Sequence, residues 1–140
     1  MMSSINLLAV LVAAIAAFVI GFLCHGPIAG KLWMKLANIH PTGNEKLSDM
    51  IPQMLWNLLV NIVTAFVTAI IILFISTSSF AGPVTWLCGA SIGALLWLGF
   101  LVTSSSIEVI WMGRSVKLWL FEAVCSLITM IAMGAIIAAW

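Results

Sequence analysis

The chain has 140 residues, of which 64% are hydrophobic and 6% are charged, and its formal net charge is +1. Average soluble chains are about 45–50% apolar and about 25% charged. Five basic and four acidic side chains are too few to solvate a globule of this length. This composition excludes a soluble enzyme, a disordered chain and a nucleic-acid binder, which needs a basic face. It fits a chain whose main partner is the lipid bilayer.

Four apolar segments are each long enough to cross the hydrocarbon core of a bilayer, which takes about 20 residues. They predict an all-α bundle of four transmembrane helices that forms a single transmembrane domain, 1–140. The expected spans are residues 5–24, 54–75, 84–112 and 118–140. The first span lacks the basic start and the cleavage site of a signal peptide, so we expect it to be retained.

Between the first two spans, residues 27–39 carry apolar residues near helical spacing, with lysines between them. We expect a short cytoplasmic interfacial helix here, with Pro27 in its first turn. For the second span we expect a cap at Ser48 or Asp49, with Pro52 in the first turn.

At the turn between the last two spans, we expect Gly113 to end one helix in a left-handed conformation. Ser115 is then expected to cap the next helix.

The basic side chains predict the orientation of the chain in the membrane. Lys31, Lys35 and Lys46 lie in the first linker, and Arg114 and Lys117 lie at the third. The second linker and both termini carry no basic side chain. By the positive-inside rule, linkers one and three face the cytoplasm, and both termini lie outside it.

Small residues recur every four positions, a spacing that lets membrane helices approach closely. We expect helix packing at Ala9, Ala13, Ala17 and Gly21 in the first span and at Gly89 and Gly93 in the third. The sequence leaves open whether these seams face other spans or a second copy of the chain.

Polar residues inside the spans gather in the cytoplasmic half, where they predict a pocket that opens to the cytoplasm and is closed outside. The candidate pocket residues are Glu122, Glu108, Arg114, Asn57, Asn61, His25 and Ser104. Thr64 and Thr68 share the face of Asn57 and Asn61, and Ser126 and Thr129 share that of Glu122.

Two interpretations of these residues stay open. In the first, Glu108 and Glu122 only neutralise Arg114 and Lys117, and the asparagines hold helices together. In the second, they form a site for a small polar ligand, an ion or a proton, with Glu122 as the central carboxyl and His25 as its partner.

Catalytic and metal-binding motifs are absent from the sequence, which has no HExxH, no GxSxG and no glycine-rich phosphate loop. We therefore expect no catalytic residue, no metal and no cofactor. Cys24, Cys88 and Cys125 lie in or beside apolar runs and are interpreted as packing residues. Trp97, near the centre of its span, is interpreted in the same way.

Several segments resemble one family of bacterial membrane proteins, the domain-of-unknown-function family seventeen-sixty-one. They are Asn6–Ala14, Gly26-Pro27, Gly30–Lys35, Leu96–Phe100, Gly113–Leu118, Met133–Ile136 and the final Trp140. The resemblance covers nearly the whole chain and implies a compact four-span protein of the bacterial inner membrane. It implies no activity.

Departures from the family pattern divide the candidate residues into those that the family shares and those particular to this chain. Cys24-His25 stands where the family tends to have an aromatic pair, and Glu108 stands where an uncharged amide is commoner. Glu122 matches an acidic position. The resemblance thus favours Glu122 and Arg114 as a shared site and makes His25 and Glu108 particular to this member.

Two functions remain as hypotheses. The first is a non-enzymatic small membrane protein that acts through helix–helix contacts, as a homo-oligomer or as an accessory subunit of a larger membrane complex. The alternative is a small transporter or ligand-binding protein that uses the polar pocket.

Overall fold

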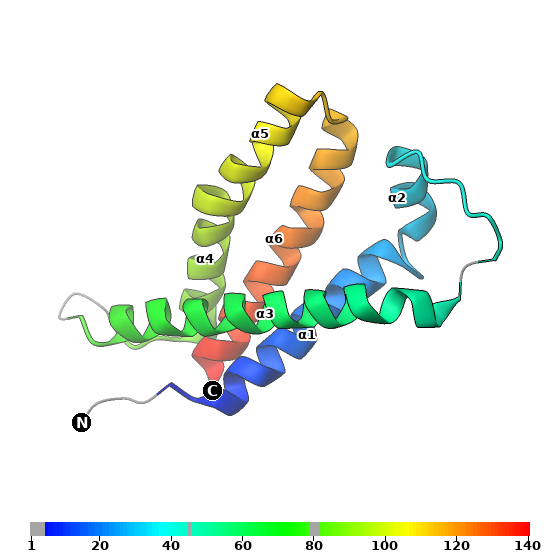
Figure 1. Cartoon of the computed structure of the whole chain (residues 1–140). Coiled ribbons are helices and arrows are strands. Elements are labelled where there is room, and N and C mark those ends of the chain that lie inside the picture. The colour runs from blue at the N-terminus through cyan, green and yellow to red at the C-terminus, as the bar shows by residue number, and fades with distance from the viewer. Residues whose placement is uncertain (1–4, 45, 79–81) are drawn as a thin grey trace.

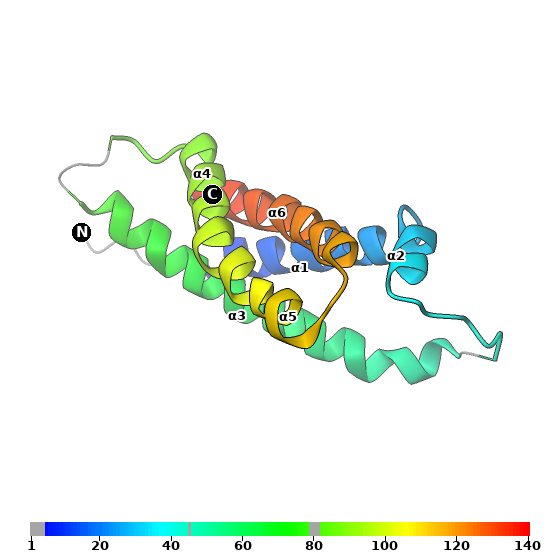
Figure 2. The same cartoon turned by 90° about the horizontal axis from the view of Figure 1, so that it is seen from above.

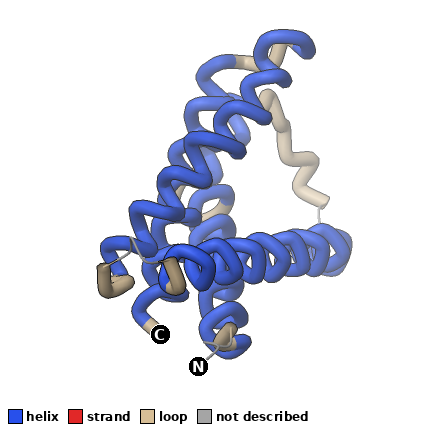
Figure 3. Tube along the Cα trace, turned by 90° about the vertical axis from the view of Figure 1, so that its left-hand side faces the viewer, coloured by secondary structure: helices blue, strands red, loops and turns tan. Residues whose placement is uncertain are grey.

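The computed structural model describes residues 5–44, 46–78 and 82–140. Within these ranges the chain forms helices and no strand (Figure 3). In chain order they are α1 (Leu7–His25), α2 (Gly30–Leu36), α3 (Leu47–Ser76), α4 (Trp86–Leu96), the π-helical η1 (Trp97–Val102), α5 (Thr103–Met112) and α6 (Val116–Ala139). Glu45 of the first linker and residues 79–81 of the second linker lie outside the described residues.

Among the described residues, four helical stretches are long and apolar enough to cross a membrane: Leu7–His25, Leu47–Ser76, Trp86–Met112 and Val116–Ala139. The predicted all-α class with four spans is therefore confirmed. The third stretch combines α4, η1 and α5 into one continuous helical path.

The helices are arranged as a fan (Figure 1). The start of α1, the end of α3, the start of α4 and the end of α6 meet at one end, near the C-terminus. Towards the other end, α3 diverges widely from α5 and α6, and Figures 1 and 3 agree on this divergence. We call this second end the basic end, because it carries Lys31, Lys35, Lys46, Arg114 and Lys117.

The core lies where α1, α3 and α6 cross. It is built mainly from small side chains, and its fully buried members include Ala13, Ala14, Ala65 and Met133. Small side chains let these helices approach closely, which is how helices associate where lipid offers no hydrophobic gain. Ala9, Ala13 and Ala17 of the predicted stripe are all buried, with exposures of 0–1%.

The second packing seam joins α4 to α6. A Cβ atom at Gly89 would lie 2.1 Å from the carbonyl oxygen of Gly134, and one at Gly93 would lie 2.1 Å from that of Met130. Only a residue without a side chain fits at such a distance. The glycine pair predicted from sequence thus packs within the chain, against a glycine of α6.

The short helix α2 is correctly placed between α1 and α3 but is shorter than the predicted 27–39. Pro27 lies in the turn before α2 and not in its first helical turn, because the chain turns directly at the end of α1, where Ile28 N–H bonds Leu23 O. At the other end, Asn38 adopts a left-handed φ of 55°, a conformation that ends helices.

The start of α3 also differs from the expectation. The helix begins at Leu47, after the N-cap Lys46, and no side chain caps it. Ser48 and Asp49 lie inside the first turn, where the Ser48 hydroxyl bonds the Asp49 carboxylate and the acid suits the helix dipole. Pro52 therefore lies beyond the first turn. The helix is longer than its apolar stretch because its first turns are polar.

The π-helical segment η1 interrupts the third span at its middle. A π turn disturbs the ordinary pairing of backbone carbonyls, and such turns are frequent at functional sites. Here Thr103 donates its hydroxyl to Gly99 O, and Ser104, Ser105 and Ser106 each donate to a carbonyl three or four residues earlier. This run of hydroxyls satisfies carbonyls at the junction of η1 and α5.

Candidate functional site

The turn between α5 and α6 places the single arginine of the chain. Gly113 ends α5 with a left-handed φ of 66°, as predicted. The N–H of Arg114 then bonds Glu108 O at 3.2 Å, which closes the turn. Ser115 is the N-cap residue of α6, as expected, but its side chain forms no capping bond.

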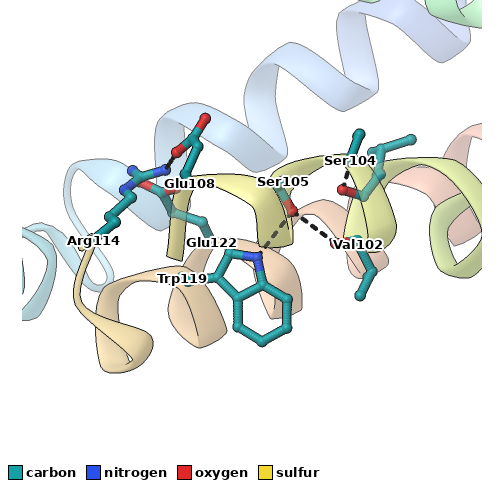
Figure 4. Close-up of polar contacts among 8 residues, drawn as sticks. Val102, Ser104, Ser105, Glu108, Arg114, Trp119 and Glu122 are labelled. Carbon is teal, nitrogen blue, oxygen red and sulfur yellow. Dashed lines mark hydrogen bonds and ion pairs between the residues drawn. The ribbon is translucent and has the colours of Figure 1, made fainter. Parts of the chain in front are cut away.

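The Arg114 guanidinium bridges two carboxylates from different helices (Figure 4). Its Nη1 bonds Glu108 Oε2 on α5, and its Nη2 lies 2.6 Å from Glu122 Oε1 on α6. The side chains of Arg114 and Glu122 are 29% and 30% exposed. The rigid fork of the guanidinium suits such double recognition, which a lysine cannot reproduce.

Glu122 also lines a groove of about 390 Å³ between α1, α3 and α6. The polar side chains of this groove come from three helices that are far apart in sequence. They are His25 from α1, Asn57, Asn61 and Thr64 from α3, and Glu122, Ser126 and Thr129 from α6. We call it the polar groove. It lies in the space that the divergence of α3 opens towards the basic end.

His25 closes one side of the polar groove. Its Nδ1 lies 2.9 Å from Gly21 O, one helical turn earlier. Its ring meets Trp33 of α2 edge-on at 5.3 Å and Phe121 of α6 at 5.9 Å. These contacts hold the imidazole in place and explain how α2 is joined to the bundle.

A second cavity of about 300 Å³ lies on the other side of Glu122, between α5 and α6. Ser104 lines this cavity and not the polar groove, together with Ser105 and Trp119, whose indole Nε1 donates to Ser105 Oγ at 2.9 Å (Figure 4). Glu122 and Ser126 line both spaces. These two side chains therefore form part of the wall between them.

Trp97 connects η1 to the same wall. Its indole N–H donates to Ala123 O at 2.9 Å and to Ser126 Oγ at 3.0 Å. The interpretation of Trp97 as a packing residue did not predict these two hydrogen bonds. The sequence signal for them is the position of the tryptophan in mid-span, where its indole N–H needs a partner.

The structure thus brings together four of the seven predicted pocket residues: His25, Asn57, Asn61 and Glu122. Arg114 and Glu108 are joined to them through Glu122. Both open interpretations keep support, since Arg114 pairs with both glutamates while one of them lines a groove. Lys117, by contrast, is exposed and forms no ion pair with any residue that the structure describes.

Gly21 differs from the rest of its stripe. A Cβ atom there would meet nothing within 4 Å, and the residue lines the polar groove beside Ala17. Its lack of a side chain leaves space in the groove, whereas the three alanines of the stripe are packed.

Among the described residues, no three histidine, cysteine, aspartate or glutamate side chains are grouped so that they could hold a metal ion. The side chains of Cys24 on α1 and Cys125 on α6 lie close to each other. Cys125 is buried, in agreement with its interpretation as a packing residue.

The fold and the groove define a multi-pass helical membrane protein whose spans enclose polar side chains at one end. The chain belongs to the family described as "Protein of unknown function (DUF1761)", whose model matches residues 8–138. This match confirms the resemblance found in the sequence. No curated protein and no solved structure matches the chain.

Proposed function

We propose that the protein is a non-enzymatic membrane protein that binds a small polar ligand in the polar groove, for storage, sensing or transport. The observation that carries the proposal is the convergence of polar side chains from α1, α3 and α6 on one groove that contains Glu122. Polar side chains at membrane depth are costly and usually mark a substrate or ion pathway.

The arrangement of the two ends supports the same proposal. The helices meet at the end that holds the start of α1 and the end of α6, and they separate at the basic end, where the groove lies (Figures 1 and 2). The groove stops at the buried side chains of Ala17, Met130 and Met133, and a separate cavity of about 710 Å³ lies at the opposite end of α1, α3 and α6. A space that ends at the packed core suits a binding site better than a continuous pore. The hydroxyls of Thr64, Ser126 and Thr129 donate to backbone carbonyls and not to a base, so we propose binding and not catalysis.

Helix–helix contact with another chain is the second candidate. The small-residue seams, which first suggested self-association, are occupied inside the chain by Ala13, Gly89 and Gly134. A partner subunit or a second copy would instead use the first half of α3, which leaves the bundle. There Leu55 and Trp56 are 62% and 68% exposed, although lipid also covers such side chains.

For the location we propose the bacterial inner (plasma) membrane, with the basic end in the cytoplasm and both termini outside it. The five basic side chains gathered at one end support this orientation. Fusion of alkaline phosphatase or of green fluorescent protein after Trp140 tests it. We expect an active phosphatase and a dark fluorescent protein, and the reverse pair of results contradicts the orientation.

The binding proposal is tested by thermal unfolding of the purified full-length protein in detergent, with and without the small-molecule extract of its native cells. A ligand that binds only the folded state raises the melting temperature. The matched control is Gly21→Leu, because residue 21 lines the groove and a Cβ atom there meets nothing within 4 Å, so the larger side chain can extend into the groove. We expect a shift for the wild type and none for Gly21→Leu. Equal shifts, or no shift in either, contradict the proposal.

A further inference from the structure

The hydroxyl groups of the polar groove have their protons already engaged. Thr64 donates to Val60 O at 2.9 Å, Ser126 to Ala123 O at 3.0 Å, and Thr129 to Cys125 O at 2.9 Å. Each bond lies within its own helix. A hydroxyl has one proton and two lone pairs, so what these side chains can offer to a ligand is acceptor oxygens.

The amide of Asn61 and the imidazole of His25 also leave acceptor atoms for a ligand. Asn61 donates its Nδ2 to the backbone oxygen of Asn57 at 3.0 Å and to its Oδ1 at 2.9 Å, so Asn61 Oδ1 remains as an acceptor. His25 places Nδ1 against Gly21 O, which can only accept. The proton of a neutral ring is therefore on Nδ1, and Nε2 is an acceptor. The Nδ2 group of Asn57 is the donor that remains among these side chains.

The net charge of Arg114, Glu108 and Glu122 also favours a ligand that donates hydrogen bonds. One guanidinium, that of Arg114, faces two carboxylates, so the group of three retains one formal negative charge. Glu122 gives Oε1 to Arg114 and lines the groove, whereas Glu108 does not line it. A charge in a membrane is costly unless it is paired, which favours a positively charged ligand beside Glu122.

Resting on the proposed function, we infer that the ligand of the polar groove is a small protonated amine, with Glu122 as its counter-ion. An ammonium group has three N–H donors and no acceptor, which complements the acceptors of Glu122, Asn61 and Thr64. A bare metal ion fits less well, because the described part of the chain offers no cluster of metal ligands. The amine belongs either to a free small molecule or to the headgroup of an aminophospholipid that enters from the bilayer.

Binding of three probes of similar size and different charge tests this inference. The probes are n-butylammonium, n-pentanol and n-pentanoate, titrated calorimetrically into the full-length protein in nanodiscs of phosphatidylcholine, whose headgroup has no N–H. We expect the ammonium to bind and the alcohol and the carboxylate to bind at least about tenfold more weakly, because hydrogen bonds to charged groups are stronger than neutral ones.

Two substitutions locate the effect. Glu122→Gln and Glu108→Gln each remove one carboxylate partner of Arg114, but only Glu122 lines the groove. We expect Glu122→Gln to weaken ammonium binding by about tenfold or more. Glu108→Gln removes the excess negative charge but keeps the carboxylate that lines the groove, so we expect a smaller loss. Lys117→Gln, at an exposed residue outside the cluster, serves as the control and should leave binding within about threefold. Folding of each variant is checked by its melting temperature, and Gly21→Leu serves as the variant with a filled groove.

The outcomes separate this inference from the proposed function. If the alcohol or the carboxylate binds best and Gly21→Leu abolishes that binding, the groove is a site but the ligand is not a cation. If no probe binds, or if Gly21→Leu changes nothing, the inference is contradicted. Replacing the lipid with phosphatidylethanolamine distinguishes the two sources, because a lipid ligand competes with the free amine and lowers its apparent affinity.

Discussion

The Nη2 atom of Arg114 lies 2.6 Å from Oε1 of Glu122, and this bond joins the turn between α5 and α6 to the wall of the polar groove. The second nitrogen of the same guanidinium holds Glu108 on α5. The ends of two helices and one side of the groove are thus positioned by a single side chain. A change at Arg114 is therefore expected to affect both stability and the groove.

Arg114→Gln is expected to lower the free energy of unfolding by about 1–2 kcal/mol. Two carboxylates lose their shared partner, and the cost is moderated because the Glu108 side chain is 43% exposed. Chemical unfolding in mixed micelles measures it. Arg114→Lys should recover only part of the loss, because an ammonium lacks the planar fork.

The matched control for this prediction is Lys117→Gln. Lys117 is exposed and has no ion-pair partner within the described ranges, so its removal should change stability by less than about 0.5 kcal/mol. Equal effects of the two substitutions would show that the loss comes from net charge and not from the bridge.

Gly134→Ala is expected to destabilise the fold by at least about 3 kcal/mol. The new Cβ atom would lie 2.1 Å from Gly89 O, so α4 and α6 must separate along their seam. Gly99→Ala is the control, since a Cβ there meets nothing within 4 Å. Melting temperatures of the two variants measure the difference, and similar values would contradict the seam.

Mild oxidation is expected to link Cys24 to Cys125 within one chain. The two thiols lie close to each other between α1 and α6, and a two-electron oxidant such as diamide converts such a pair to a disulfide. Alkylation followed by mass spectrometry should find both thiols protected while Cys88, on α4, remains reactive. Cross-linking between chains instead would contradict the placement of α1 against α6.

Trp97→Phe is expected to cost about 1–2 kcal/mol of stability, because it removes the indole N–H that donates to Ala123 O and Ser126 Oγ. Trp111→Phe provides the control, since Trp111 is 82% exposed and its change should lie within about 0.5 kcal/mol. Comparable losses in the two variants would mean that the bonds of Trp97 add nothing to stability.

The sequence predicts the helices well because the signal is strong and local. Apolar runs of about 20 residues identify the spans, and Gly113 identifies the turn that ends α5. The sequence predicts the first residues of the helices less well than the spans. The polar residues before the second apolar run, including Ser48 and Asp49, belong to α3, although their composition suggests a cap or loop.

The sequence predicts which polar residues form the candidate site. It does not predict that they line two separate cavities. Helical spacing places Asn57, Asn61 and Glu122 on inward faces, and the structure gathers them. Spacing cannot give the angle between helices, which depends on the packing of Ala13 and Gly134. That angle opens the groove, and together with the π turn it leaves Ser104 in a separate cavity.

Native mass spectrometry of the full-length protein, extracted gently from its own membranes, tests the central claim most directly. We predict a mass excess equal to one small molecule on the wild type and on Lys117→Gln, absent from Gly21→Leu. The claim is contradicted if the wild type carries no small molecule, or if the same excess remains on Gly21→Leu.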